Sequence, residues 1–522
     1  MGYPRAASPL FRRCRERWER ARDTYSDRDL AARSALLVAG VAGMSAARAV
    51  SFIHSVPDRQ EPGFPPLLWL FHQADMLFLP AANRLPGQTP ILYVQCLALA
   101  LALCCFYLAA RAVIPVWLLR HARPLGAASL ALGTVLGLLT LQGTLPYGLL
   151  AGSTHHYGND ATAATSCAVD DLLSAHNPYS AFRMGPCLQR TFPGKDGTVP
   201  VQEAAIKTTP LRAGAFRHIS TYPSPAQLDA QFSRAQRAHR AYPAEFESYF
   251  SYPSAAFLFP AIFVALHIHD ISIPFSLCYL AVAALILWRS SGRARWVALL
   301  VILANAALWP TLLGGATDGL YALLVLSGWV VRDRRWASAL LLGLAVATRQ
   351  QAWFYLLFYA VLIWQTQGRR EALWRLGIVA GVFVGLNAPF FLTAPGAWTA
   401  GVLGPMRDAM FPRGTGLVAL SIGGKGSLPL LPRAAYTLLE GAALVASLWF
   451  YRRTCRVHPG TGLVLAPIAL FLAYRSLYTY FLPISLLALY PALVDRVRPT
   501  DPIRVPVADE EDGPADRAIV AA

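Results

Sequence analysis

Charged side chains are scarce in this chain. Of its 522 residues only 14% are Asp, Glu, Lys or Arg, while 55% are hydrophobic. A soluble protein of this size carries about 25% charged residues. Several apolar runs also exceed the roughly 18 residues needed to cross the hydrocarbon core of a bilayer. The composition therefore excludes an ordinary soluble globular protein and predicts an all-α polytopic membrane protein.

Acidic residues are the scarcer of the two charged kinds, 29 against 46 basic ones, which gives a net charge of +17. No basic patch interleaved with aromatic residues and no zinc spacing accompanies this charge, which argues against a nucleic-acid-binding protein. The arginines form short clusters between apolar runs, a pattern that sets membrane topology and that attracts anionic headgroups. We therefore expect membrane lipid, and no nucleic acid, among the partners.

Apolar runs with Arg-rich breaks between them account for most of the chain. They predict about 11–13 transmembrane helices in a multi-pass protein of the cell membrane. The expected spans lie near 33–54, 91–118, 125–151, 254–269, 273–289, 295–313, 317–331, 336–348, 352–366, 373–393, 434–452, 462–475 and 477–494.

Basic clusters between these runs predict which segments face the cytoplasm. RHAR at 120–123, RSSGRAR at 289–295 and RDRR at 332–335 are examples. One crossing is then required before RSSGRAR where two apolar segments are found. Either 254–269 forms a re-entrant hairpin, which we favour, or the positive-inside rule does not hold at 289–295. The resulting organisation has a basic cytoplasmic segment at 1–32, N-terminal transmembrane helices at 33–151, an extracytoplasmic loop at 152–252, a transmembrane core at 253–494 and a disordered cytoplasmic tail at 495–522.

The large loop is too long to be a simple connector. Its first part, 160–176, has apolar residues at the spacing of an amphipathic helix lying on the bilayer, and the break at 177–178 ends that helix. Asp160 begins the helix and is either a helix cap or a functional carboxylate. Asp170 and Asp171, near its other end, are expected to be solvated.

Cysteine is also sparse, with eight residues in the chain, and none stands with histidines at zinc-ligand spacing. Cys167 and Cys187 are the only two in the large loop. An oxidising exterior favours a disulfide between them. No Asp-x-Asp pair appears, so the requirement for a divalent metal stays open and we assign no metal ligand.

Four stretches of sequence, taken together and in order, resemble a family of membrane enzymes. They are HNPY at 176–179, shortly after an Asp at a membrane exit; YFSYPSAAFLFP at 249–260; residues 314–358, with a Gly-x-x-Asp turn and an Arg-Gln pair; and NAPFFLTAPGAWTAGVLGPM at 387–406. The set resembles the GT-C superfamily of integral-membrane glycosyltransferases that use polyprenyl-phosphate sugars, and most closely its mannosyltransferase-like branch. The likeness covers about 140–500 and does not identify the sugar.

Two positions depart from the family's pattern. Ala175 stands where the family usually has Gly before Asn-Pro-Tyr, and Arg349 stands where the family commonly has Lys. Arginine keeps the charge and offers a bidentate fork suited to phosphate.

The resemblance implies transfer of a sugar from a polyprenyl-phosphate donor to a hydroxyl of a glycan, lipid or protein acceptor at the outer membrane face. A hydroxyl is a poor nucleophile, so a carboxylate must accept its proton as the bond to C1 forms. Asp160 is the candidate general base, and direct displacement with one carboxylate predicts inversion. Arg349 and Arg475 are candidates for binding the leaving phosphate; the alternative for both is snorkelling at a span end.

Further candidates for substrate binding lie near these groups. Asp318 either orients the acceptor or caps a helix. Asn177 and Tyr179 are included, although shaping the loop is the favoured role for both. Tyr478 either binds sugar through its ring or belongs to an interfacial aromatic belt. Gln350, which follows Arg349, completes the set.

Two other classes of function compete with an enzyme. A lipid or solute transporter would place ionisable residues inside spans at mid-bilayer, whereas the charges here gather at span ends and in the loop. No internal repeat is visible, so an inverted-repeat transporter has no support. A non-catalytic scaffold for envelope assembly is the third class.

Overall fold

The computed structural model describes residues 27–48, 89–151, 160–184, 186–187, 249–313, 315–407, 412–422 and 428–495, with a few positions between 230 and 238. The predicted basic segment at 1–32 lies largely outside these residues, and all but the first residue of the predicted tail at 495–522 does too. The described part is mostly helical, as the apolar runs predict.

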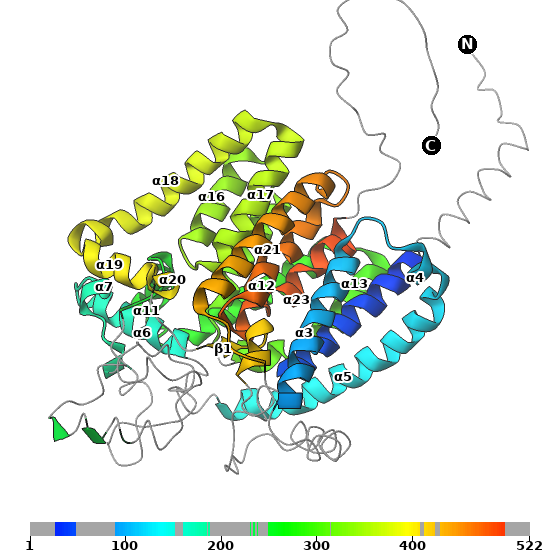
Figure 1. Cartoon of the computed structure of the whole chain (residues 1–522), viewed down its shortest axis with the longest axis horizontal. Helices are drawn as coiled ribbons and strands as arrows, with labels where there is room; N and C mark the ends of the chain where they lie inside the picture. Colours follow the sequence, from blue (N-terminus) through cyan, green and yellow to red (C-terminus); the bar gives the residue numbers. More distant parts are fainter. Residues whose placement is uncertain are drawn as a thin grey trace, which may run out of the picture.

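Among the described residues, six helices are long and apolar enough to cross a membrane. The first is Asp27–Arg48, and the others lie within α3 (Thr89–Ala110), α5 (Ala122–Ala151), α12 (Ser272–Arg289), α18 (Arg369–Thr393) and α21 (Arg433–Thr454). Figure 1 shows them as the long ribbons of one bundle, with the short helix α4 (Val116–Arg120) between α3 and α5.

The remaining helices of the bundle are shorter. They are α11 (Ala255–Ala265), α13 (Gly292–Leu303), α14 (Leu308–Leu313), α15 (Asp318–Val330), α16 (Arg335–Val346) and α17 (Gln351–Gln367). At 1.5 Å per residue, a helix of 11–13 residues reaches only about 16–20 Å, less than the roughly 30 Å of a hydrocarbon core. The predicted span 254–269 is therefore one short helix that turns into α12, not a hairpin.

One predicted span, 295–313, is broken at Asn305. The Asn305 Nδ2 donates to Ser485 Oγ at 2.7 Å, and its Oδ1 accepts from the Leu308 N–H at 3.2 Å. Asparagine side chains bond neighbouring backbone in this way and interrupt a continuous helix. As a result α13 ends at Leu303 and α14 begins at Leu308.

The predicted spans 462–475 and 477–494 are also not continuous helices. Prolines at 467, 483 and 491 interrupt them, because proline removes a backbone donor and clashes with the preceding turn. The chain forms η3 (Pro459–Thr461), α22 (Gly462–Leu465), η4 (Ala466–Leu472), β2 (Arg475–Ser476), η5 (Tyr478–Tyr480), α23 (Ile484–Leu487) and η6 (Tyr490–Val494). The two-residue strand β2 pairs in parallel with β1 (Arg413–Gly414).

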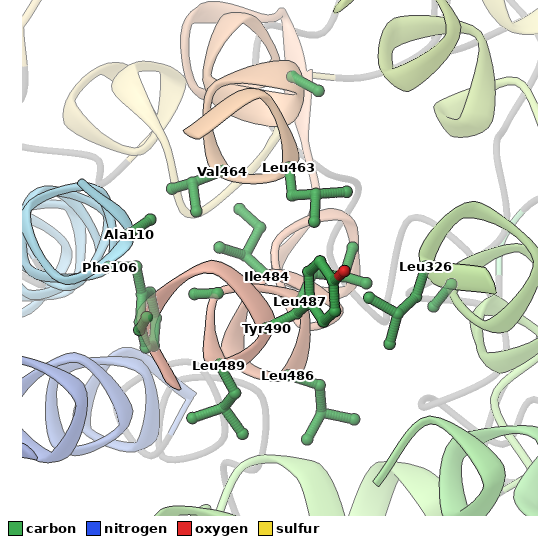
Figure 2. Close-up of a cluster of buried hydrophobic side chains, with 14 of the residues drawn as sticks. Phe106, Ala110, Leu326, Leu463, Val464, Ile484, Leu486, Leu487, Leu489 and Tyr490 are labelled. Carbon is green, nitrogen blue, oxygen red and sulfur yellow. The ribbon is translucent and has the colours of Figure 1, made fainter. Parts of the chain in front are cut away.

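This C-terminal segment is buried at the centre of the bundle rather than standing at its edge. In Figure 2, side chains of α23 and η6 are surrounded by α3, α15 and α22. The labelled neighbours include Phe106 of α3, Leu326 of α15 and Leu463 of α22. Burial of such side chains is the main stabilising term of the cluster, and it explains why these apolar residues form a packed core instead of two separate spans.

Helices α15 to α18 run up and down in order, joined by short turns at 331–334, 347–350 and 368. Gly368 has φ +95°, a conformation that favours glycine. Because the four helices alternate in direction, the turns at 331–334 and 368 lie at one end of the bundle, and the start of α15 and the 347–350 turn lie at the other. We call these the basic end and the site end.

The described part of the large loop lies at the site end. Helix α6 (Asp160–Leu173) packs on α11, and a short helix α7 (Pro178–Ala181) follows. Ala164, Cys167 and Ala168 are buried against the protein. The sequence predicts that the apolar face of this helix lies on the bilayer. In the structure that face packs on α11 instead.

Candidate functional site

Arg349 and Asp318 form a buried ion pair at the site end. Arg349 lies in the turn between α16 and α17, and Asp318 is the first residue of α15. The Arg349 Nη1 is 3.5 Å from the Asp318 Oδ1, and the two side chains are only 7% and 5% exposed. The α15–α16 hairpin brings its two free ends together and thereby joins these residues. From the sequence, Arg349 is a candidate for binding phosphate, and Asp318 for orienting the acceptor or capping a helix.

Tyr252 covers a face of the Arg349 guanidinium. The guanidinium carbon is 4.2 Å from the centre of the Tyr252 ring, within cation–π range. Burial by itself lowers the pKa of Arg349, but the Asp318 carboxylate raises it, and the net shift is upward. Arg349 therefore carries its positive charge at any physiological pH.

Tyrosine hydroxyls gather around this ion pair. Those of Tyr279 (α12), Tyr321 (α15) and Tyr355 (α17) are buried near Asp318, and that of Tyr478 (η5) is buried near Tyr279 and Arg48. These hydroxyls, Asp318 Oδ1 and Arg349 Nε have no hydrogen-bond partner in the described part of the chain. Buried polar atoms in proteins are almost always hydrogen-bonded. A cluster of them around a charged pair therefore marks a candidate site for polar chemistry.

Sequence reasoning missed Tyr279, Tyr321 and Tyr355, because each stands in an apolar run and resembles an ordinary core residue. One signal was available. Tyr321 follows Asp318 by three positions on α15, so the two share a helix face.

Asp160 begins α6, at the site end, and its side chain lies outside what the structure describes. Two residues later, the Thr162 Oγ1 donates to the Gly315 carbonyl at 2.7 Å. Gly315 has φ +71°, and a Cβ there would come within 2.3 Å of the Ser272 Cβ. The first turn of α6 is thus joined to the tight turn that leads into Asp318.

Cys167 and Cys187 are joined by the disulfide expected from the sequence, with their Cα atoms 5.9 Å apart. Both are buried, in a cluster with Phe182 and Val402. The bridge ties α6 to the segment that follows α7.

Asn177 and Tyr179 make structural contacts. The Asn177 Oδ1 accepts from the Tyr179 N–H at 3.0 Å and its Nδ2 donates to the Phe390 carbonyl at 3.0 Å. Tyr179 is fully buried, and its hydroxyl donates to the Tyr252 carbonyl at 2.8 Å. Both residues shape the loop, and Tyr179 positions the backbone of the tyrosine that covers Arg349.

Gln350 and Asn387 hold neighbouring segments in place. The Gln350 Nε2 donates to the Ser251 carbonyl at 2.6 Å and to the Val402 carbonyl at 2.9 Å. The Asn387 Oδ1 accepts from the Ser254 N–H and from Trp398 Nε1, each at 3.1 Å. Residues from three of the sequence stretches quoted above therefore meet in one place, beside Arg349.

Arg475 and Tyr478 lie in the short C-terminal segment that contains β2 and η5. Arg475 lies in β2, paired with Arg413 of β1, and the phenol of Tyr480 is close enough to raise the pKa of Arg349. Arg48, which the sequence did not single out, bonds the Ala307 carbonyl and Thr311 Oγ1 at the same end.

No group of three or more His, Cys, Asp or Glu residues that could hold a metal ion is found in the described ranges. Comparisons of the chain with protein-family models, with curated proteins and with solved structures found no match.

Proposed function

We propose that the protein is an integral-membrane glycosyltransferase that moves a sugar from a polyprenyl-phosphate donor to an acceptor hydroxyl. The donor's lipid would enter between helices of the membrane-spanning bundle, and transfer would take place at the site end, facing outward. The observation that carries the proposal is the permanently charged Arg349, buried with Asp318 among tyrosine hydroxyls, together with the bond from the first turn of α6, where Asp160 begins the helix, to the turn that leads into Asp318.

In the proposed reaction, Asp160 accepts the proton of the acceptor hydroxyl while the oxygen of that hydroxyl forms a bond to the sugar C1. The bond between C1 and the phosphate oxygen breaks, and the polyprenyl phosphate leaves with the electron pair. Negative charge grows on the leaving phosphate, and a preorganised cation stabilises it. Arg349 would supply that cation, with Arg475 as the second candidate, and displacement in one step inverts the anomeric centre.

A panel of polyprenyl-phosphate hexoses and pentoses, offered together with a glycan and lipid acceptor extract to the purified full chain in nanodiscs, tests this function through acceptor-dependent release of polyprenyl phosphate. The Asp160→Asn variant keeps size and capping ability, so a helix-cap role predicts little change. A general base predicts a loss of about 10²–10⁴-fold in turnover. Asp170→Asn and Asp171→Asn are matched controls on the same helix and should keep their activity. Parental activity in Asp160→Asn would refute the base assignment, and no turnover of any donor by the parent would refute the function.

A solute transporter is the second candidate, because ionisable groups buried inside a helix bundle commonly mark a transport pathway. The Asp318–Arg349 pair and its tyrosines have that character. Counterflow of free sugars or sugar phosphates in proteoliposomes, without turnover of any lipid-linked donor, would favour this candidate over the enzyme.

A further inference from the structure

The basic end of the bundle carries a large excess of positive charge. Among the residues that the structure describes, seventeen arginines and five carboxylates lie at or near the helix ends there. Several carboxylates are already used within the protein: Asp495 pairs with Arg332, and Glu371 pairs with both Arg335 and Arg375. Most of the remaining positive charge faces outward.

Two helix ends at this face form a compact basic surface. The Arg456 Nε donates to the Gln365 carbonyl at 3.0 Å and so joins the end of α21 to the end of α17. Around this contact stand the exposed arginines at 369, 370, 452 and 453. Arg369 and Arg453 have no carboxylate partner in the described part of the chain. We call this set the α17–α21 arginine surface.

Tryptophan rings lie beneath two of these arginines. The guanidinium carbon of Arg453 is 3.8 Å from the centre of the Trp449 ring, and that of Arg369 is 5.9 Å from the centre of the Trp364 ring. Stacking holds a guanidinium in a fixed plane while its N–H groups remain free to bind a phosphate in bidentate fashion. Trp449 and Trp364 are 55% and 50% exposed, which suits rings at a membrane interface.

An exposed apolar strip continues from this surface along α21. Val445 is 67% exposed and lies one turn before Trp449, so the two share a helix face. A charged headgroup at the arginines could therefore keep its hydrocarbon chains on Val445 and Trp449. A peptide or nucleic acid would not need that apolar strip.

We propose that the α17–α21 arginine surface is a binding site for an anionic phospholipid, with the phosphate between Arg369 and Arg453 and the acyl chains along Val445 and Trp449. The site is independent of the proposed sugar transfer. It lies at the other end of the bundle from Arg349 and shares no residue with it.

Native mass spectrometry of the full chain in detergent, titrated with phosphatidylglycerol or with phosphatidylcholine, tests the proposal. We expect tighter binding of phosphatidylglycerol. The Arg369→Gln/Arg453→Gln variant should weaken that binding by about fivefold per arginine, since each basic residue near an anionic surface contributes roughly 1 kcal/mol. Trp449→Ala should also weaken it, while Arg453→Lys should retain part of it.

Arg120→Gln/Arg123→Gln is the matched control, because it removes the same charge from exposed positions at the same end. Its phosphatidylglycerol affinity should stay within about twofold of the parent's, as expected for screened charges at a distance. Equal losses in both double variants would overturn the proposal in favour of diffuse charge attraction. Equal affinity for the two lipids would overturn it as well, and so would inorganic phosphate that competes at the lipid's own concentration. Unchanged thermal unfolding of each variant shows that the fold is intact.

Discussion

Most arginines at the basic end of the helix bundle are exposed, with Arg33 and Arg375 as buried exceptions, whereas the arginine that marks the site end is buried. At the basic end, arginines such as Arg369 and Arg453 are exposed and stacked on tryptophan. At the site end, Arg349 and Asp318 are removed from solvent and face each other. An exposed charge keeps its hydration, so its removal changes the folding stability little. A buried charge depends on its partner. Removing an arginine should therefore cost little stability where it is exposed and much more where it is buried.

The largest effect is expected from Arg349→Ala, which leaves the Asp318 carboxylate buried without its cation. Removing one partner of a buried pair costs about 3–5 kcal/mol of folding stability, so this variant should unfold at a much lower temperature, and its loss of activity will be partly a loss of fold. Arg349→Lys keeps the charge and should keep part of the folding stability and part of the activity. Exposed Arg453→Gln is the comparison, expected within about 0.5 kcal/mol.

A double variant separates the two roles of Arg349. Arg349→Gln/Asp318→Asn removes both charges, so its stability should recover relative to Arg349→Ala while donor use stays lost. Thermal unfolding in detergent, alongside donor turnover, gives both quantities. If Arg349→Ala is no less stable than Arg453→Gln, the contrast between the two ends is wrong.

The disulfide should produce the next largest effect, and only at the site end. The bridged cysteines are 20 positions apart, and closing a loop of that size stabilises by roughly 3 kcal/mol in the chain-entropy model. Cys167→Ser/Cys187→Ser should lower the unfolding temperature by a corresponding amount. Cys104→Ser, at an exposed free thiol, should change nothing measurable.

Asn387 offers a sharper test of how the site end is held together. Asn387→Ala leaves the Ser254 N–H and the Trp398 Nε1 without their acceptor, and an unsatisfied buried donor costs roughly 1–3 kcal/mol. Ser254→Ala is the control, because the backbone N–H keeps its bond to Asn387 and only the hydroxyl contact to the Leu386 carbonyl is lost. Equal unfolding temperatures for the two variants would contradict the role given to Asn387.

The smallest effect concerns pH at the basic end. The His458 Nδ1 accepts from the Ala112 N–H at 3.0 Å, and burial, followed by Arg111 and Arg33, lowers the pKa of this histidine. Its neutral form is therefore favoured in the folded state. The stability that it contributes is complete above the usual histidine pKa of about 6.5 and declines as the pH falls below it, where the unfolded chain binds the proton more readily.

Unfolding temperatures measured across this pH range should show a decline that His458→Gln reduces. His176 is a suitable comparison, since it is exposed at the site end, and His176→Gln should leave the pH dependence as it was. A parental profile that is flat below pH 6.5 would contradict the prediction for His458.

Much of this contrast could be predicted from the sequence, but not all of it. Arg-rich breaks such as RDRR at 332–335 lie at helix ends, because apolar runs set the helices and charges interrupt them. The pairing of Arg349 with Asp318 depends on the α15–α16 hairpin returning the chain to its starting level, which composition alone does not specify. The interruption at Asn305 depends on a bond to Ser485, 180 positions away, and no local pattern reveals such a partner. The role of Asp160 stays a prediction.

The bond between Thr162 and the Gly315 carbonyl also bears on the biogenesis of the protein. The two residues are 153 positions apart, so a nascent chain must be extended past residue 315 before the start of α6 can dock on its final support. Cys167, within α6, and Cys187, after α7, are separated by only 20 residues and can meet long before that point, because short loops close faster than long ones. Oxidation of the loop would then precede assembly of the site. A stalled intermediate would carry the disulfide on an α6 whose first turn has not yet bonded to Gly315.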